Sequence, residues 1–398
     1  IVNPSYQADK DRLELYDNKG KLLQVIEGKY NNYKTAFFNT DQIKIKLIQT
    51  WGDGKYYGFK INRISFIRKK SIHIKRDDIQ KEILSKLQFP QWKIENNFSL
   101  FNRLEEKLKK KVIGQSNVLK QLSDISKIGY ITGRIGEKPI GSGLFVGPTG
   151  VGKTYIAKVY AKTLGLKLIT IDMTSFQSLH SFDYFMEVME EQLTSNPHSI
   201  FIFEEIEKAN YKVLDRLFFL LDEGIFYDRF QRPLSGRGAF ILMTTNATKD
   251  IILKNPNDQN LRKKVNSELR KYFRDSFINR FDFVGIFKPF TDQNFKDLAK
   301  ILSKKAIKTL KKRFNWNITL DQTIYDFLGV YGKSKTFGAR PLERLIEKVL
   351  NGGLAEFVIK WGTIPEKAEV YFKNIERNPF KFEININNKK LIYEVNPQ

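Results

Sequence analysis

Eight consecutive residues have the types and spacing that bind the phosphates of a nucleotide. They follow the pattern G-x-x-x-x-G-K with Ser or Thr next, and they lie between an apolar run at 144–146 and a helix-like segment at 155–164. Glycines let backbone N–H groups surround an anion, and the helix that follows presents the positive end of its dipole. The expected phosphate-binding residues are Gly147, Pro148, Thr149, Gly150, Val151, Gly152, Lys153 and Thr154.

Two residues of this loop have distinct expected roles. The Lys153 ammonium reaches the β- and γ-phosphates, and the Thr154 hydroxyl is a ligand for Mg²⁺. An acidic pair, Glu204 and Glu205, follows a later apolar run. In such a site Glu204 holds Mg²⁺ through its waters, and Glu205 polarises the water that attacks the γ-phosphate. The competing interpretation is that the acidic pair caps a helix beginning near Ile206.

The elements that must bring these groups together are strands of a parallel sheet. Continuous apolar runs alternate with helix-like segments, which is typical of an α/β fold whose parallel sheet is covered on both faces. The carboxyl ends of such strands meet at one edge of the sheet. We therefore expect Asn246, which follows another apolar run, to orient the attacking water beside the loop. The expected strands are 144–146, 167–171, 199–203 and 239–243.

Seven motifs occur along the chain in a fixed order. They are Val112-Ile-Gly-Gln115, Gly141-Ser-Gly-Leu-Phe-Val-Gly-Pro-Thr-Gly-Val-Gly-Lys-Thr154, Phe203-Glu-Glu-Ile-Glu-Lys-Ala209, Leu221-Asp-Glu-Gly224, Met243-Thr-Thr-Asn246, Phe273-Arg-Asp-Ser-Phe-Ile-Asn-Arg280 and Phe337-Gly-Ala-Arg-Pro-Leu342. This set resembles the AAA+ ATPases of the Clp unfoldase and disaggregase class, most closely their second ATPase module. The resemblance implies a P-loop large domain, a small helical C-terminal domain, ATP or ADP with Mg²⁺ as ligands, and a homo-oligomeric hexameric ring.

The resemblance also implies roles for individual residues. Val112 and Ile113 cradle the adenine, and Asn246 is the sensor on the strand beside the phosphate loop. Arg280 resembles the arginine finger that reaches the γ-phosphate bound by a neighbouring subunit. Arg340 resembles the second sensor, which the small domain contributes to its own nucleotide. A fixed guanidinium stabilises the charge that develops during phosphoryl transfer. The competing interpretation of Arg280 is that it forms an ion pair on the surface. For Arg340 the competing interpretation is likewise a surface residue.

Two departures from the Clp pattern bear on function. Where that class usually has Asp, this chain has Glu204, which is one methylene longer. Because the Mg²⁺ geometry must adjust to the longer side chain, an ATP-binding switch or scaffold with weak hydrolysis stays open. The stretch 174–185 stands where Clp unfoldases carry a glycine-flanked pore loop, and it lacks those glycines. Phe182 is the candidate gripping aromatic, but we favour the interpretation that Phe182 and Phe185 begin a helix and pack in the core. Residues 247–273 contain no apolar tripeptide of the peptidase-docking kind, so we expect no proteolytic partner.

Segments on either side of this module predict two further domains. Period-two alternation at 13–16, 22–26, 43–47 and 59–64 predicts a small, mainly β N-terminal domain. Basic residues and aromatics interleave there, which leaves nucleic-acid binding open beside a solvated face. After residue 290, helices at 292–314, 320–331 and 341–361 and two or three closing strands from residue 368 are expected. The predicted domains are 1–95, 96–290 and 291–398.

The composition excludes several classes of protein and leaves two interpretations of the net charge. The 398 residues carry a formal net charge of +24, which indicates either a nucleic-acid or other anionic partner or compositional bias. There is no cysteine, which excludes a disulfide framework and a zinc ribbon. No apolar run approaches the roughly 20 residues that span a bilayer, so we expect no membrane span and a cytoplasmic location. The chain begins at Ile1, which leaves a longer parent protein open.

The sequence therefore supports one functional hypothesis and two alternatives. We expect an ATP-hydrolysing, ring-forming AAA+ motor of the Clp chaperone type that remodels or disassembles a protein complex, with its client bound through the N-terminal domain. The first alternative is a nucleic-acid-associated AAA+ ATPase of the loader or initiator type, motivated by the net charge. The second is an ATP-binding switch or scaffold that hydrolyses ATP weakly, motivated by Glu204.

Overall fold

The structure is a computed structural model of the chain. It describes residues 98–132, 138–362, 365–366, 368–377 and 380–396 and, before them, the backbone of six strands between residues 10 and 73. The chain divides into two compact units, Ile1–Glu95 and Asn96–Gln398, and each is described by itself. None of the helices in the described part of the chain has the length and apolar character needed to cross a membrane.

The first unit contains a four-stranded antiparallel sheet with the order β2-β1-β4-β5. The predicted strands at 13–16, 22–26 and 43–47 lie within β1, β2 and β4. The basic and aromatic side chains that motivated nucleic-acid binding lie outside the described residues, as does most of the predicted strand 59–64. The strands are β1 (Lys10–Asp17), β2 (Leu22–Gly28), β3 (Phe37–Phe38), β4 (Gln42–Thr50), β5 (Ile64–Ile67) and β6 (Ile72–His73).

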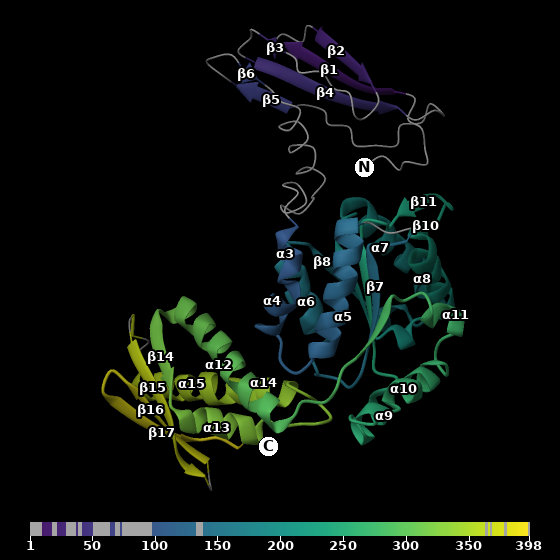
Figure 1. Cartoon of the computed structure of the whole chain (residues 1–398). Helices are drawn as coiled ribbons and strands as arrows, with labels where there is room; N and C mark the ends of the chain where they lie inside the picture. The colour runs from purple at the N-terminus through teal and green to yellow at the C-terminus, as the bar shows by residue number, and fades with distance from the viewer. Residues whose placement is uncertain are drawn as a thin grey trace. The chain divides into compact units, whose positions relative to one another are not determined.

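The second unit contains a five-stranded parallel sheet of order β13-β7-β12-β9-β8, which confirms the predicted parallel sheet (Figure 1). Every residue of β7 and β12 is buried, which explains why these strands read as continuous apolar runs. The last strand, β13, was not among the predicted strands. The strands are β7 (Gly141–Val146), β8 (Leu168–Asp172), β9 (Ile200–Glu204), β12 (Phe240–Thr245) and β13 (Phe283–Ile286).

Helices cover both faces of this sheet. Alternate strand residues such as Leu144, Phe201 and Ile241 pack in one core cluster with α7 and α8, whereas α5 and α6 contact the strands from the other face (Figure 1). The helices of this part are α3 (Ser99–Asn102), α4 (Leu104–Lys109), α5 (Ser116–Lys127), α6 (Lys153–Leu164), α7 (Phe182–Ser195), α8 (Tyr211–Glu223), α9 (Lys249–Lys254), α10 (Leu261–Leu269) and α11 (Asp275–Ile278). A short hairpin, β10 (Ile225–Tyr227) and β11 (Pro233–Ser235), follows α8.

The segment before the sheet contains two short helices where the sequence pattern predicts one amphipathic helix over 100–111. Arg103 leaves the helical region, with φ −117° and ψ 16°, and separates α3 from α4. The break lets Phe101, Leu104 and Leu108 all reach zero exposure in the core.

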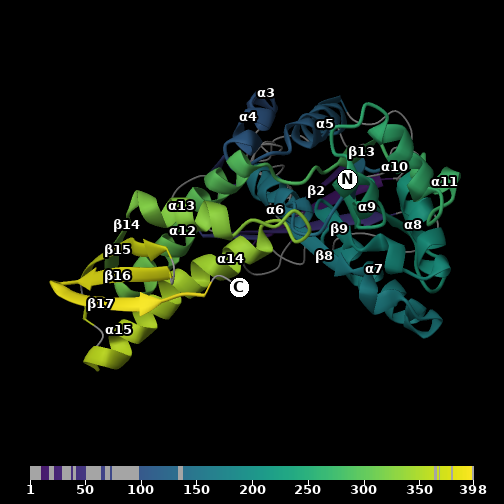
Figure 2. The same cartoon turned by 90° about the horizontal axis from the view of Figure 1, so that it is seen from below.

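The small C-terminal part has its own core cluster and a four-stranded sheet of order β14-β15-β16-β17. Figure 2 shows β15, β16 and β17 side by side beyond the helices. The predicted helix 292–314 and the closing strands are confirmed, but the helix expected to start at Leu320 starts two residues later because Leu320 ends β14. The elements are α12 (Asp292–Phe314), β14 (Trp316–Leu320), α13 (Gln322–Tyr331), α14 (Arg340–Glu347), α15 (Gly353–Trp361), β15 (Ala368–Arg377), β16 (Phe380–Ile386) and β17 (Lys389–Glu394).

Candidate functional site

The phosphate loop connects the end of β7 to the start of α6. Gly147, Gly150 and Gly152 have φ values of 145°, 77° and 99°, which side chains other than glycine rarely adopt. A Cβ atom on Gly150 would also overlap the carbonyl oxygen of Phe337, which belongs to the small part of this unit. The glycines therefore give the loop its curvature, and Gly150 also lets the backbone at Phe337 lie directly against the loop.

The ammonium of Lys153 lies inside this loop. Its Nζ donates to the carbonyl oxygens of Gly147 and Pro148 at 2.6 and 2.8 Å and to Oδ1 of Asn246 at 2.7 Å. Lys153 is only 8% exposed. Burial lowers its pKa to about 8, although the nearby carboxylates of Glu207 and Glu205 oppose that shift. The structure thus brings the predicted lysine and the predicted sensor together at the sheet edge.

The two predicted magnesium ligands face one another. The Thr154 hydroxyl donates a hydrogen bond to the Glu204 carboxylate, so the hydroxyl from α6 and the carboxylate from β9 share one location. Mg²⁺ prefers oxygen ligands, takes few of them from the protein and keeps several waters. This donor set fits Mg²⁺, and the longer side chain of Glu204 reaches the Thr154 hydroxyl.

Glu205 adopts an unusual backbone conformation for a non-glycine residue. Its φ of 55° and ψ of 50° lie in the left-handed region, which is strained for a side chain of this size. Its N–H donates to Oγ1 of Thr244 at 3.3 Å. Although Glu205 precedes the 3₁₀ turn at Ile206–Lys208, its side chain makes no capping hydrogen bond. The capping interpretation of Glu205 is therefore not supported.

A third carboxylate, which the sequence motifs did not single out, joins the site. Oε1 of Glu207 accepts the backbone N–H of Asn246 at 3.0 Å, while its buried Oε2 has no hydrogen-bond partner among the described residues. Glu207 also exerts the largest charge effect on Lys153. The available signal was its place in the same motif, three residues after Glu204.

The small part of the unit reaches the loop through its backbone. Ala339 donates its N–H to the carbonyl oxygen of Gly150 at 3.0 Å. Arg340 is exposed at the start of α14, and its positive charge is among the influences that lower the pKa of Lys153. The predicted second sensor therefore lies beside the phosphate loop.

The segment expected to cradle adenine is tied to the same loop. Val112 is buried and Ile113 is half-buried. The next motif residue that forms hydrogen bonds is Gln115, whose Nε2 donates to the carbonyls of Lys288 at 2.9 Å and Val151 at 3.4 Å. Its Oε1 accepts the N–H of Lys288 at 3.2 Å. Gln115 is 4% exposed, so it locks this segment against the nucleotide loop.

Arg280 lies apart from these residues. Its carbonyl oxygen accepts a hydrogen bond from Ser142, near the amino end of β7, whereas the phosphate loop follows Val146 at the other end. That part of the strand is about 13 Å long. The guanidinium forms an ion pair with Asp222, with Nε 3.0 Å from Oδ1. The structure therefore does not bring Arg280 to the phosphate loop of its own chain.

The stretch at the pore-loop position has a local organisation of its own. Phe185 is buried at 0% and Phe182 is half-buried against the core, in line with the interpretation that both begin a helix. Asn210 holds the stretch by donating from its side chain to the carbonyls of Phe176 and Ser178 at 2.9 and 3.0 Å. The exposed large apolar side chains here are Leu179, Tyr184 and Tyr211, at 50%, 60% and 58%.

Two family models match adjoining segments of the chain. Residues 138–284 match the model described as AAA domain (Cdc48 subfamily), and residues 290–372 match the C-terminal, D2-small domain of ClpB protein. The chain belongs to the AAA+ ATPases of the Clp class. The D2-small match covers the part that carries Arg340, and the AAA match covers the phosphate loop, Glu204 to Glu207 and Arg280.

Curated relatives agree with this assignment of a Clp-class AAA+ module. The chain is 32% identical over 294 residues to chaperone protein ClpB of Malacoplasma penetrans (strain HF-2), covering 68% of this chain and 39% of that protein. It is 32% identical over 293 residues to ClpB of Mycoplasmoides gallisepticum (strain R(low / passage 15 / clone 2)), covering 70% and 40%. The chain thus spans well under half the length of these relatives.

A solved structure shows the same fold as this Clp-class chain. A closed-state cryo-EM reconstruction of Hsp104 with ATPγS and FITC casein has a TM-score of 0.67 and 23% identity, over 79% of this chain and 56% of that one. The curated relatives named here are ClpB chaperones, so the nucleic-acid loader or initiator alternative is not favoured.

Proposed function

We propose that the chain is the ATP-hydrolysing part of a ring-forming Clp-type chaperone that remodels or disassembles protein complexes. The observation that carries this proposal is the meeting of Lys153, Asn246, Glu207 and the Thr154–Glu204 pair at one edge of the sheet. Each of these groups matches a requirement of phosphoryl transfer from ATP to water.

In the proposed reaction the chain's own residues bind and orient the reactants. The N–H groups of the loop and the Lys153 ammonium hold the phosphates, and Asn246 and Glu205 orient and polarise the attacking water. Thr154 and Glu204 would hold Mg²⁺, which supplies charge neutralisation on the phosphates when bound. Because Glu204 reaches the Thr154 hydroxyl, we favour hydrolysis over a switch with weak turnover.

The position of Arg280 supports the proposed ring. Within its own chain this residue pairs with Asp222 near the far end of β7 from the loop. A guanidinium that serves a neighbouring subunit makes hydrolysis depend on assembly. We propose a hexamer of identical subunits, in which Arg280 completes the adjacent nucleotide site and Arg340 completes its own.

The proposed client is an unfolded or partly folded protein. Leu179, Tyr184 and Tyr211 form an exposed apolar group on two neighbouring segments, and such a group suits apolar segments of a polypeptide. The solved Hsp104 structure holds casein, which supports testing that class of client. Client binding by the N-terminal unit, the absence of a peptidase partner and a cytoplasmic location stay predictions.

The test measures ATP turnover of the chain alone, with casein and with duplex DNA. We expect casein to stimulate turnover and DNA to leave it unchanged. DNA stimulation that falls steeply with salt would replace this proposal by the loader alternative. ATP binding without turnover under all three conditions would favour the switch.

A matched pair of variants separates client contact from catalysis. Tyr211→Ala should weaken casein stimulation while leaving basal turnover intact, because Tyr211 makes no contact with the nucleotide residues named above. The control is Tyr272→Ala, since Tyr272 is similarly exposed at 49% but lies after α10. Equal casein stimulation in both variants would remove Tyr211 from the client surface.

A further inference from the structure

Two residues of α8 hold the guanidinium of Arg280. Oδ1 of Asp222 lies 3.0 Å from Nε, and the Phe218 ring lies under the guanidinium carbon at 5.3 Å from the ring centroid. Arg280 and Asp222 are only 36% and 27% exposed at their side chains. Contact by a carboxylate on one side and a ring on the other restricts the rotation of a long, flexible side chain.

The contact leaves the reactive end of the guanidinium available. Nε is buried and lies within ion-pair distance of Asp222 without forming a hydrogen bond to it, and neither terminal nitrogen of Arg280 donates a hydrogen bond to another residue in the described ranges. Those terminal nitrogens carry four of the five N–H donors of the group. The Asp222 charge beside Nε and the Phe218 ring therefore restrain the stem of the side chain, and the terminal nitrogens stay available for an anion.

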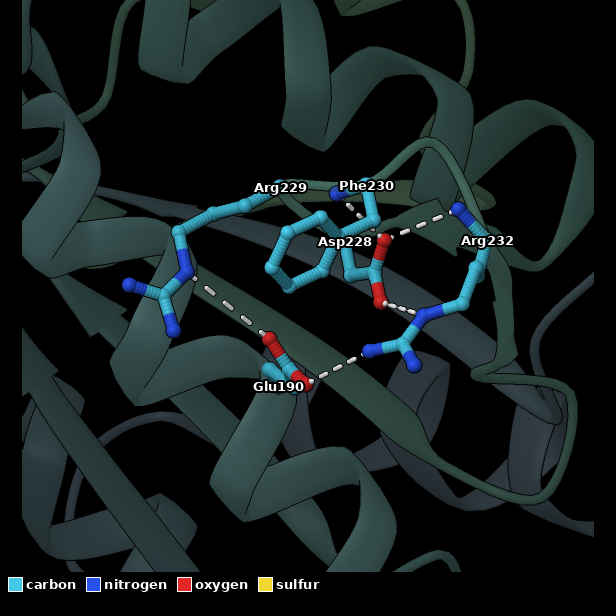
Figure 3. A network of polar contacts seen from close by, with 5 residues as sticks. All are labelled: Glu190, Asp228, Arg229, Phe230 and Arg232. Carbon is cyan, nitrogen blue, oxygen red and sulfur yellow. Dashed lines mark hydrogen bonds and ion pairs between the residues drawn. The ribbon is translucent and has the colours of Figure 1, made fainter.

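The hairpin that follows Asp222 is held by its own hydrogen bonds. Immediately after α8 comes Gly224, whose φ of 62° turns the chain into the β10–β11 hairpin. At the tip of that hairpin the buried Asp228 accepts hydrogen bonds from the N–H groups of Phe230 and Arg232, both at 2.8 Å, and from Nε of Arg232 at 2.6 Å (Figure 3).

Ion pairs also connect the hairpin to α7. Glu190 of α7 lies 3.1 Å from Arg232 and 4.0 Å from Arg229 (Figure 3). Burial opposes ionisation of Asp228, but the hydrogen bonds from Arg232 and Phe230 outweigh it and lower the pKa of this carboxyl. Asp222 thus belongs to the last turn of α8, directly before a hairpin that is cross-linked to α7.

We propose that Asp222 and Phe218 are positioning residues that aim Arg280 at the γ-phosphate held by the neighbouring subunit. This inference rests on the proposed function, because it assigns Arg280 to a shared site. It extends that function by naming the groups of the same subunit that orient the Arg280 guanidinium before it contacts the nucleotide of the neighbouring subunit. Preorganised charge of this kind lowers the reorganisation that the transition state requires.

A nearby ion pair provides the contrast. On the same helix, Asp215 lies 3.4 Å from Arg274, and their side chains are 54% and 78% exposed. An exposed pair of that kind contributes little. Asp215→Asn therefore serves as the matched control for Asp222→Asn, since both replace one α8 carboxylate with an amide of the same size.

The experiment compares steady-state ATP turnover in the full chain. Asp222→Asn should lower kcat about tenfold with KM and ATP affinity unchanged, because a misaimed group loses transition-state contact only. Phe218→Leu should lower kcat about threefold, as expected for a lost cation–π contact. Asp215→Asn should match the parent. In an Arg280→Ala background, Asp222→Asn should cause no further loss.

Each other outcome has a defined meaning. Full turnover by Arg280→Ala would overturn the shared site, and with it the proposed function. Loss of turnover by Arg280→Ala with parental or faster turnover by Asp222→Asn would overturn the positioning role alone. A further loss in the double variant, or a fall in ATP affinity and melting temperature by Asp222→Asn, would show a structural role and overturn it as well.

Discussion

The backbone N–H of Ala339 donates a hydrogen bond to the carbonyl oxygen of Gly150, 3.0 Å away. This bond joins the small C-terminal part to the middle of the phosphate loop. The two backbones lie very close together at this bond. A Cβ atom on Gly338 would overlap the backbone of Gly150, and a Cβ atom on Gly150 would overlap the backbone of Phe337. Movement of the small part is thereby linked to the shape of the loop and to the position of Arg340.

We expect Gly338→Ala to weaken ATP binding at least tenfold. Gly338 has φ 60° and backbone atoms of Gly150 against the position of a Cβ, so the new methyl group must push the two segments apart. Isothermal titration with a non-hydrolysable ATP analogue measures the effect. The control is Gly352→Ala, because Gly352 is helical at φ −60° with open space around it. Parental affinity in Gly338→Ala would contradict the linkage.

Glu207→Ala should lower turnover about tenfold, because Asn246 then loses the carboxylate that fixes its backbone at 3.0 Å. ATP affinity should stay equal or rise, since a negative charge near the phosphates is removed. Glu207→Gln should recover much of the turnover, because its amide oxygen still accepts the N–H. Glu191→Ala, at an exposed position of α7, is the control. Equal loss in the Ala and Gln variants would rule out the hydrogen-bond role.

The small part should lose stability in acid through Asp321. Oδ1 of Asp321 accepts the N–H of Thr323 at 2.9 Å, and Oδ2 accepts the hydroxyl of Tyr371 at 2.8 Å. The hydrogen bonds from these two residues lower the pKa of Asp321 to about 2. A carboxylate with a lowered pKa stabilises the fold above its unfolded value of about 4, and that contribution disappears as pH falls toward 2.

Asp321→Ala therefore should cost about 1 kcal/mol at neutral pH, as for other lost helix caps. The difference from the parent should shrink as pH falls from about 4 toward 2. Tryptophan fluorescence during urea unfolding measures it, because Trp316 is buried in the same core. A difference that stays constant down to pH 2.5 would exclude the titration of this group as its cause.

Local sequence patterns account for much of the nucleotide site. The residues of the loop, the strand ends and the lysine are specified by consecutive sequence, because a tight glycine turn and a buried strand each leave a local signature. Lys153 and Asn246 are each recognisable in this way, and they lie 2.7 Å apart. The α12 helix begins at Asp292 and ends at Phe314, the bounds that the sequence predicts.

Local sequence patterns do not predict the contacts between segments that are distant in the chain. Glu207 contacts Asn246 and Asp222 contacts Arg280 through side chains that are far apart in sequence, and nothing in the composition of either segment specifies its partner. The strand β14 is absent from the predicted elements because its five residues directly follow a long helix. Its alternation of buried and exposed residues is too short to overcome that context.

The most direct test of the shared, ring-based site mixes two inactive variants. Arg280→Ala keeps an intact Glu205 but offers no finger, and Glu205→Gln keeps Arg280 but cannot polarise the attacking water. In rings that assemble randomly from equal amounts, about a quarter of the interfaces pair an intact Glu205 with an intact Arg280. The account predicts that steady-state ATP turnover of the mixture rises to about a quarter of the parental rate. Turnover in mixed rings that stays as low as in each variant alone would contradict it.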